Sequence, residues 1–190
     1  MNVSGKEFMN AAIYYKYIDE KLNLLSLRVG RSGKLNLLDI NSHSEDFYER
    51  FLNLVYGWNL VNLNLKHHNV EGIDLEDKVN KLVVQVSATC TKEKIEKSLS
   101  KKKLSEYQGY TFKFIHISDK DSDVLKKKTY LNTYGLRFEA STDIIDVTSL
   151  LRDLKSKDAE SLIKIYQFIK SELGGDIDIA KLESNLATII

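Results

Sequence analysis

The first apolar pattern in the chain has the period of an amphipathic helix. Over residues 5–29, apolar side chains recur at spacings that place them on one helical face, and Ser4 is a suitable N-cap. This stripe comprises Phe8, Ala12, Tyr15, Leu22, Leu25 and Val29. Ile13, Tyr14 and Ile18 fall outside it. We therefore expect a long N-terminal helix with additional apolar surface that a second copy of the chain could cover.

Shorter apolar patterns follow, and glycine supplies most of the breaks between them because the chain contains no proline. The predicted elements, in order, are a turn at 30–33 that ends the first helix, a connector or short strand at 34–41, a helix from Ser42 or Ser44 to about Tyr56, strands at 60–65, 73–76 and 82–88, a helix at 92–104, a strand at 111–118, a polar irregular segment at 119–134, a short edge strand at 144–147, and helices at 148–154 and 162–173. This order predicts an α/β fold with three layers, in which helices flank a mixed central sheet.

The strand at 82–88 is apolar except for Gln85 and Ser87, a pattern that predicts a strand buried on both faces. Successive strand residues face opposite sides of a sheet, so these two polar residues share a face with Val83, and Val84 and Val86 occupy the other face. A buried amide that lacks a partner costs about 1–3 kcal/mol for each unsatisfied group. A hairpin through residues 77–80 would bring Asp74 close to Gln85.

Composition favours one ordinary globular domain. The chain has 190 residues and is 43% apolar, and we expect a single domain over 1–175, with 176–190 starting a helix or a linker that leads to a further domain. No run approaches the ~20 apolar residues that cross a bilayer, and no signal peptide is evident, so we expect a cytoplasmic protein. Cys90 is the only cysteine, which excludes an intramolecular disulfide and a zinc site of several thiolates.

The net charge of +1 gives no overall attraction to nucleic acid. Two local basic clusters remain: one is Lys101, Lys102 and Lys103, and the other spans 126–128. These lysines either bind nucleic acid or only solvate helix ends and loops. The chain has no Gly-rich phosphate loop, GxSxG elbow or HExxH helix, which removes several classes of enzyme. The adjacent His67 and His68 are weak candidates for a metal site, because neighbouring side chains point in different directions.

The spacing of Asp74, Gln85 and Ser87 resembles the core of the PD-(D/E)XK nucleases. In that family, an Asp ends one strand, and the next strand carries an acidic residue or Gln, one spacer, and a Lys. Ser87 stands where the family has Lys, and it cannot supply a positive charge. Some members carry this Lys on the following helix, where this chain has Lys94.

A larger part of the chain, most of residues 5–173, resembles the SMEK domain. The segments that carry this resemblance are LVYGWNLVNLN at 54–64, IDL at 73–75 and VVQVSATCTKEKI at 83–95. Such domains occupy the N-terminal end of longer bacterial proteins suspected of acting in defence against phage. The two resemblances together imply a restriction-endonuclease-like fold in a bacterial defence protein.

The nuclease resemblance implies a Mg²⁺ or Mn²⁺ site. Asp74 would be the main ligand, Glu45 or its neighbour Glu49 would add a second carboxylate, and Gln85 would ligate through its amide oxygen. Lys94 would orient water or stabilise the transition state. Each residue also has an ordinary structural explanation: Asp74 as a turn residue, Gln85 as a hydrogen-bonding partner, Glu45 at a helix N-terminus and Lys94 at the surface.

Two functions therefore stay open at the level of sequence. One is a metal-dependent nuclease that cuts DNA, or alternatively RNA, and acts as the effector of a defence protein. The other is a catalytically inactive domain of the same fold that binds nucleic acid or forms oligomers.

Overall fold

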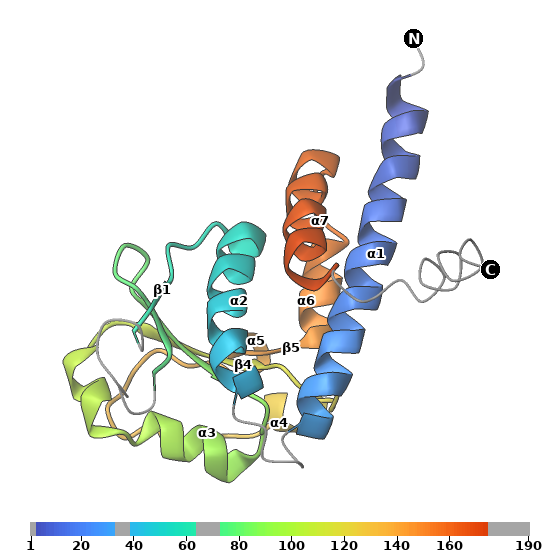
Figure 1. The fold of residues 1–190 in the computed structure, drawn as a ribbon. Helices are drawn as coiled ribbons and strands as arrows, with labels where there is room; N and C mark the ends of the chain where they lie inside the picture. Colours follow the sequence, from blue (N-terminus) through green and yellow to red (C-terminus); the bar gives the residue numbers. More distant parts are fainter. Residues whose placement is uncertain (1–2, 33–38, 64–72, 175–190) are drawn as a thin grey trace.

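The computed structural model describes residues 3–32, 39–63 and 73–174 (Figure 1). Within these ranges lie seven α-helices, one 3₁₀ helix and five strands: α1 (Val3–Ser32), α2 (Asp39–Tyr56), β1 (Val61–Asn62), β2 (Leu75–Asp77), β3 (Leu82–Ser87), α3 (Lys92–Leu99), the 3₁₀ helix η1 (Lys102–Glu106), β4 (Thr111–His116), α4 (Asp123–Lys126), α5 (Ala140–Asp143), β5 (Ile144–Asp146), α6 (Val147–Leu154) and α7 (Ala159–Leu173).

The five strands form one mixed sheet in the order β1-β2-β3-β4-β5. The pairs β1–β2 and β2–β3 are antiparallel, whereas β3–β4 and β4–β5 are parallel. The crossover from β3 to β4 contains α3 and η1, as a parallel connection requires. The expected mixed α/β architecture is confirmed, and its relation to restriction endonucleases stays a prediction.

The sheet separates two apolar cores. Val84 and Val86 face a core formed with α1, α2, α6 and α7, whereas Val83 faces a core that includes residues of α3 and Phe112 and Phe114 of β4. Figure 1 shows α3 on one side of the sheet, with α2 and α7 on the other. All six residues of β3 are buried, which confirms the prediction of a strand covered on both faces.

The predicted direction of two side chains at the start of β2 is wrong. In the strand predicted at 73–76, simple alternation would place Ile73 and Leu75 on one face, but these residues belong to opposite cores. The β2–β3 ladder is regular at Leu75 and Val84, and it is irregular one residue earlier, where the Asp74 N–H donates to the Val84 carbonyl. The chain therefore turns between Ile73 and Leu75, which the simple alternation of a strand does not describe.

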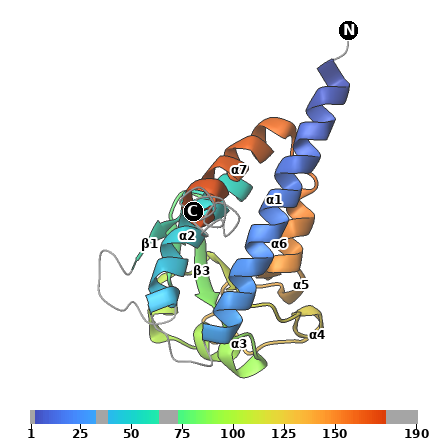
Figure 2. The ribbon, with the colours of Figure 1, turned by 45° about the vertical axis from the view of Figure 1, so that its right-hand side comes forward.

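Helix α1 differs from its prediction in two places. It continues through Gly30, which was expected to end it, and a Cβ at this position would collide with the Asp119 carboxylate. Ile18, expected at the surface, is fully buried, and Tyr14 packs against Tyr166 of α7. Ile13 remains 61% exposed. Figures 1 and 2 both show α1 lying along α7, so this helix pair, rather than a second copy, covers most of the extra apolar surface.

Helix α2 protects the exposed edge of the sheet at β1. The Asn62 N–H donates to Glu49 Oε2 at 2.8 Å, and the Asn62 side-chain amide donates to Asp46 Oδ1 at 2.6 Å. An edge strand otherwise presents unpaired backbone groups to other chains. Glu49, an alternative metal ligand in the sequence-based hypothesis, thus binds the backbone of β1.

We predict that Glu49→Ala lowers the free energy of unfolding by about 1–3 kcal/mol, because it leaves the N–H of the buried Asn62 without its acceptor. Glu49→Gln keeps an acceptor oxygen and should lose much less. Urea unfolding of both variants measures the difference. An alanine variant as stable as the glutamine variant would show that the Glu49 contact contributes nothing to the edge.

Candidate functional site

Asp74 directly precedes β2, and its carboxylate accepts hydrogen bonds from two residues of β3. The Val86 N–H donates to Asp74 Oδ2 at 2.7 Å, and Gln85 Nε2 donates to the same oxygen at 2.5 Å. Only 8% of Asp74 and 7% of Gln85 are exposed. The structure therefore brings together the two residues that the hairpin was predicted to join, in a buried polar pair.

The orientation of the Gln85 amide follows from its neighbours. Besides the Asp74 carboxylate, Nε2 lies 3.3 Å from the Val86 carbonyl oxygen. Both neighbours are acceptors only, so the amide must present its nitrogen to them. In this state the amide oxygen, which the sequence-based hypothesis expects to bind a metal ion, faces away from Asp74.

A pocket of about 360 Å³ opens beside this pair, at the carboxyl end of β3. Glu45 of α2 and Lys94 of α3 line it, together with Ile117 and the segment 86–89. Two distant segments that the sequence-based hypothesis assigned to one site thus contribute to one pocket. The adjacent Gln85 and Asp74 connect to it through the backbone of Val86.

Lys94 gives this pocket a positive charge. It belongs to the first turn of α3, where its backbone N–H donates to the Thr91 cap. The side chain is half-buried, and no ion pair of Lys94 occurs among the residues that the structure describes. The α3 N-terminus adds the positive end of its helix dipole. A phosphate bound in the pocket would interact favourably with both the Lys94 ammonium group and the N-terminus of α3.

Ser87, which stands where the resemblance to the PD-(D/E)XK nucleases would require a Lys, bonds within its own turn. Its hydroxyl donates to the Thr89 carbonyl at 2.9 Å and accepts from the Thr89 N–H at 3.2 Å. These bonds close the turn that leads from β3 to α3. A positive charge in the pocket therefore has to come from another residue.

The donor set suits a hard divalent cation. Glu45 lines the pocket and Asp74 is bonded to its lining residue Val86, so two carboxylates and the Val86 carbonyl could provide oxygen donors of the kind that Mg²⁺ accepts alongside several waters. Gln85 fits as a ligand only with its amide turned the other way.

A second polar region lies at the carboxyl ends of the three parallel strands. Ser87, His116 and Asp146 are aligned across β3, β4 and β5, and all three are buried. The two ring nitrogens of His116 bond to the hydroxyls of Ser122 and Ser118 at 2.9 and 2.7 Å. Burial lowers the pKa of His116, which favours a neutral ring, although Asp146 opposes this shift.

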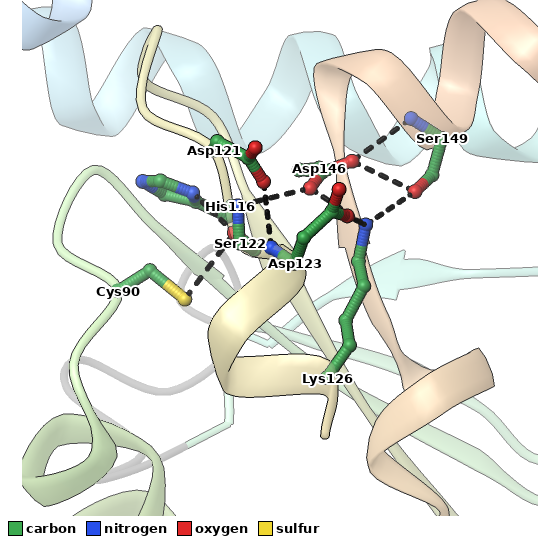
Figure 3. A network of polar contacts seen from close by, with 8 residues as sticks. All are labelled: Cys90, His116, Asp121, Ser122, Asp123, Lys126, Asp146 and Ser149. Atoms are coloured by element: carbon green, nitrogen blue, oxygen red, sulfur yellow. Dashed lines mark hydrogen bonds and ion pairs between the residues drawn. The ribbon is translucent and has the colours of Figure 1, made fainter. Parts of the chain in front are cut away.

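Figure 3 shows how this network continues from Ser122. The Ser122 N–H donates to Asp146 Oδ2, and its hydroxyl contacts Cys90 Sγ. Burial raises the pKa of the Cys90 thiol, which favours the protonated form at neutral pH. The network ties the loop after β3 to the loop after β4 and to the last residue of β5.

Asp121, Asp123 and Asp146 bring carboxylate oxygens within 4.8 Å of one another and could hold a metal ion (Figure 3). Lys126 already provides a positive charge there, since its Nζ lies 2.7 Å from Asp146 Oδ2 and 2.9 Å from Ser149 Oγ. Burial by itself would raise the pKa of Asp146, but the bonds from Lys126 and Ser149 lower it. Lys126 thus belongs to this cluster and not to an open basic surface.

The sequence-based hypothesis did not include this network. Its signal was available: His116 and Ser118 interrupt an apolar strand pattern as Gln85 does. The partners Ser122 and Asp146 were not predictable from that pattern, because they come from other segments.

The predicted nucleic-acid-binding lysines lie away from the pocket at Lys94. Lys103 lines a different cavity of about 880 Å³ with Lys78, Tyr107 and Tyr110, and it pairs with Glu106. Lys101 and Lys102 adjoin it at the start of η1, at the other end of α3. The structure does not bring these lysines together with Asp74 or Glu45. His67 and His68 lie outside the described residues.

We predict that protonation of His116 destabilises the fold. The unfolded imidazole titrates near 6.5, and the folded one titrates lower, so the unfolded state binds more protons between these values. Stability should therefore fall as the pH drops from about 6.5 through the folded pKa. Urea unfolding from pH 7 to 5 measures this slope, which should become flatter in His116→Gln. An unchanged slope in that variant would assign the effect to other groups.

We also predict that Asp74→Ala and Asp74→Asn differ in stability. Alanine leaves the buried Val86 N–H without its side-chain acceptor, at a cost of about 1–3 kcal/mol. Asparagine keeps an oxygen at this position and should cost less. Thermal unfolding of both variants tests this, and equal losses would show that the charge, not the acceptor, is what stabilises this corner.

In the described part of the chain, no helix combines the length and apolarity needed to cross a bilayer.

No curated protein and no solved structure gives a significant match to this sequence. The family model of the SMEK domain matches residues 17–155, a range that includes α2, the whole sheet and the pocket at the end of β3. The chain belongs to the SMEK domain family.

Proposed function

We propose that this domain is a metal-dependent nuclease that hydrolyses phosphodiester bonds in the pocket at the end of β3. The observation that carries the proposal is the composition of this pocket. Glu45 and the half-buried Lys94 line it, Lys94 forms no ion pair with the residues that the structure describes, and the buried Asp74–Gln85 pair lies next to the pocket. A half-buried ammonium group near two carboxylates is an arrangement in which a phosphate and a divalent cation could be bound together.

Asp74 and Glu45 would hold a divalent cation, with the Val86 carbonyl as a further donor. When bound, the cation would activate a water molecule and neutralise charge on the phosphate. The bond from the Val86 N–H fixes the direction of the Asp74 carboxylate. Gln85 keeps that carboxylate paired within the apolar surroundings of β3.

Lys94 would contact the scissile phosphate. Its ammonium and the α3 N-terminus both favour a negative charge in the pocket. This arrangement assigns to Lys94 the role that Ser87 cannot perform.

The substrate would be nucleic acid, DNA in the first instance and RNA as the other possibility. Lys101, Lys102 and Lys103 would then touch a strand at a distance from the cut, since α3 separates them from the pocket by ~10 Å at 1.5 Å per residue. Lys103 is held by Glu106, which limits its contribution.

The wider setting is part of the proposal. We infer a restriction-endonuclease-like fold acting in the bacterial cytoplasm as the effector domain of a longer defence protein, in a homo-oligomer. The mixed sheet and the position of the pocket at the end of β3 support the fold assignment. The exposed Ile13 on α1 supports self-association weakly.

A second candidate is a catalytically inactive domain that binds nucleic acid or assembles with other copies. Ser87 favours it, because a residue that closes a turn has replaced the family's Lys on β3. In that case the pocket would bind a phosphate without cutting the strand.

We predict that Lys94→Gln lowers the rate of Mg²⁺- or Mn²⁺-dependent cleavage by about 10²–10³, the usual effect of removing one group that stabilises transition-state charge. Asp74→Asn should abolish cleavage while it preserves the fold. Lys97→Gln is the matched control, since Lys97 is exposed on the same helix and does not line the pocket. Plasmid and single-stranded substrates provide the assay.

Cleavage that survives in Asp74→Asn would contradict the proposed site. If the wild-type protein binds a nucleic-acid strand but never cuts it, and Lys94→Gln loses that binding, the domain is a catalytically inactive nucleic-acid-binding domain instead.

A further inference from the structure

The Gln85 side-chain NH₂ occupies the space between two oxygen atoms that would otherwise attract a cation. Nε2 lies 2.5 Å from Asp74 Oδ2 and 3.3 Å from the Val86 carbonyl oxygen. With 93% of the residue covered, water cannot easily replace these contacts. The two hydrogens of the amide provide the positive partial charge that this oxygen pair requires.

We propose that the Gln85 amide is a two-state latch on the cation site: its NH₂ faces Asp74 in the resting state, and the amide turns over to present its oxygen when a divalent cation binds. This inference rests on the proposed cation site at Asp74. It assigns to Gln85 a control of metal loading, in addition to the role of ligand.

The Gln85 amide has two possible orientations because its nitrogen and oxygen can exchange positions. The amide nitrogen and oxygen have nearly the same size, so turning the amide places an oxygen where Nε2 was. Three oxygen atoms, from Asp74, Gln85 and Val86, would then converge. Without a cation this arrangement is repulsive, and with one it is a set of hard oxygen ligands of the kind that Mg²⁺ accepts.

The latch makes cation binding weaker than the ligand set alone would give. Each binding event has to break the bonds from Nε2 to Asp74 and to Val86 before the new ones form. A glutamate at position 85 cannot donate to either oxygen, so Gln85→Glu removes the resting state. It also adds a second negative charge beside Asp74.

The test is calorimetric titration of the 190-residue chain with Mn²⁺ alone, in the wild type and in Gln85→Glu. The glutamate variant should bind Mn²⁺ at least ~10-fold more tightly, and Asp74→Asn should bind no ion at this place. Asp123→Asn is the matched control for the separate acidic cluster, and it should leave the titration unchanged. Equal affinities in wild type and Gln85→Glu, or binding lost in Asp123→Asn, would overturn the latch.

A second measurement tests the latch in the wild-type protein and therefore does not require Gln85→Glu to fold. In the wild type, the ¹H–¹⁵N signals of the Gln85 side-chain NH₂, assigned by their absence in Gln85→Met, should shift when Mg²⁺ is added. Binding of Mg²⁺ that perturbs Asp74 without moving the Gln85 NH₂ signals would overturn the latch and leave the nuclease proposal intact. Shifts and tight Mn²⁺ binding without any cleavage would support the latch and count against hydrolysis.

Discussion

The complete burial of β3 is the constraint on which the other features depend. This strand pairs with β2 on one side and β4 on the other, and an apolar core covers each face. Any polar group on it must therefore find a partner inside the protein. Gln85 finds Asp74, and Ser87 bonds to the turn that follows the strand. The candidate site exists because these requirements are met at the carboxyl end of one strand.

The same strand is the boundary between the antiparallel and parallel halves of the sheet. On the antiparallel side, the irregular ladder directs the Asp74 carboxylate to the Val86 N–H. On the parallel side, the crossover through α3 returns Lys94 to the end of the strand. Carboxylate and ammonium groups thus meet at one pocket although no local motif joins them. The buried network around His116 ties the neighbouring loops together.

The sequence was sufficient to predict the features that depend on local periodicity. The burial of β3, the hairpin that joins Asp74 to Gln85 and the helix that carries Lys94 all follow from short patterns. The opposite faces of Ile73 and Leu75 were not predictable, since a bond between a side chain and the backbone leaves no mark on hydropathy. The alignment of His116 with Asp146 depends on parallel register between distant segments, which the sequence pattern does not encode.

The most direct test of the account is a crystal structure of the chain grown with Mn²⁺, with data collected at a wavelength where manganese scatters anomalously. We expect an anomalous peak within bonding distance of Asp74, on the side facing Glu45 and Lys94, with the Gln85 oxygen turned towards it. A peak only among Asp121, Asp123 and Asp146, with the Gln85 nitrogen still on Asp74, would contradict the assignment of the cation site to the end of β3.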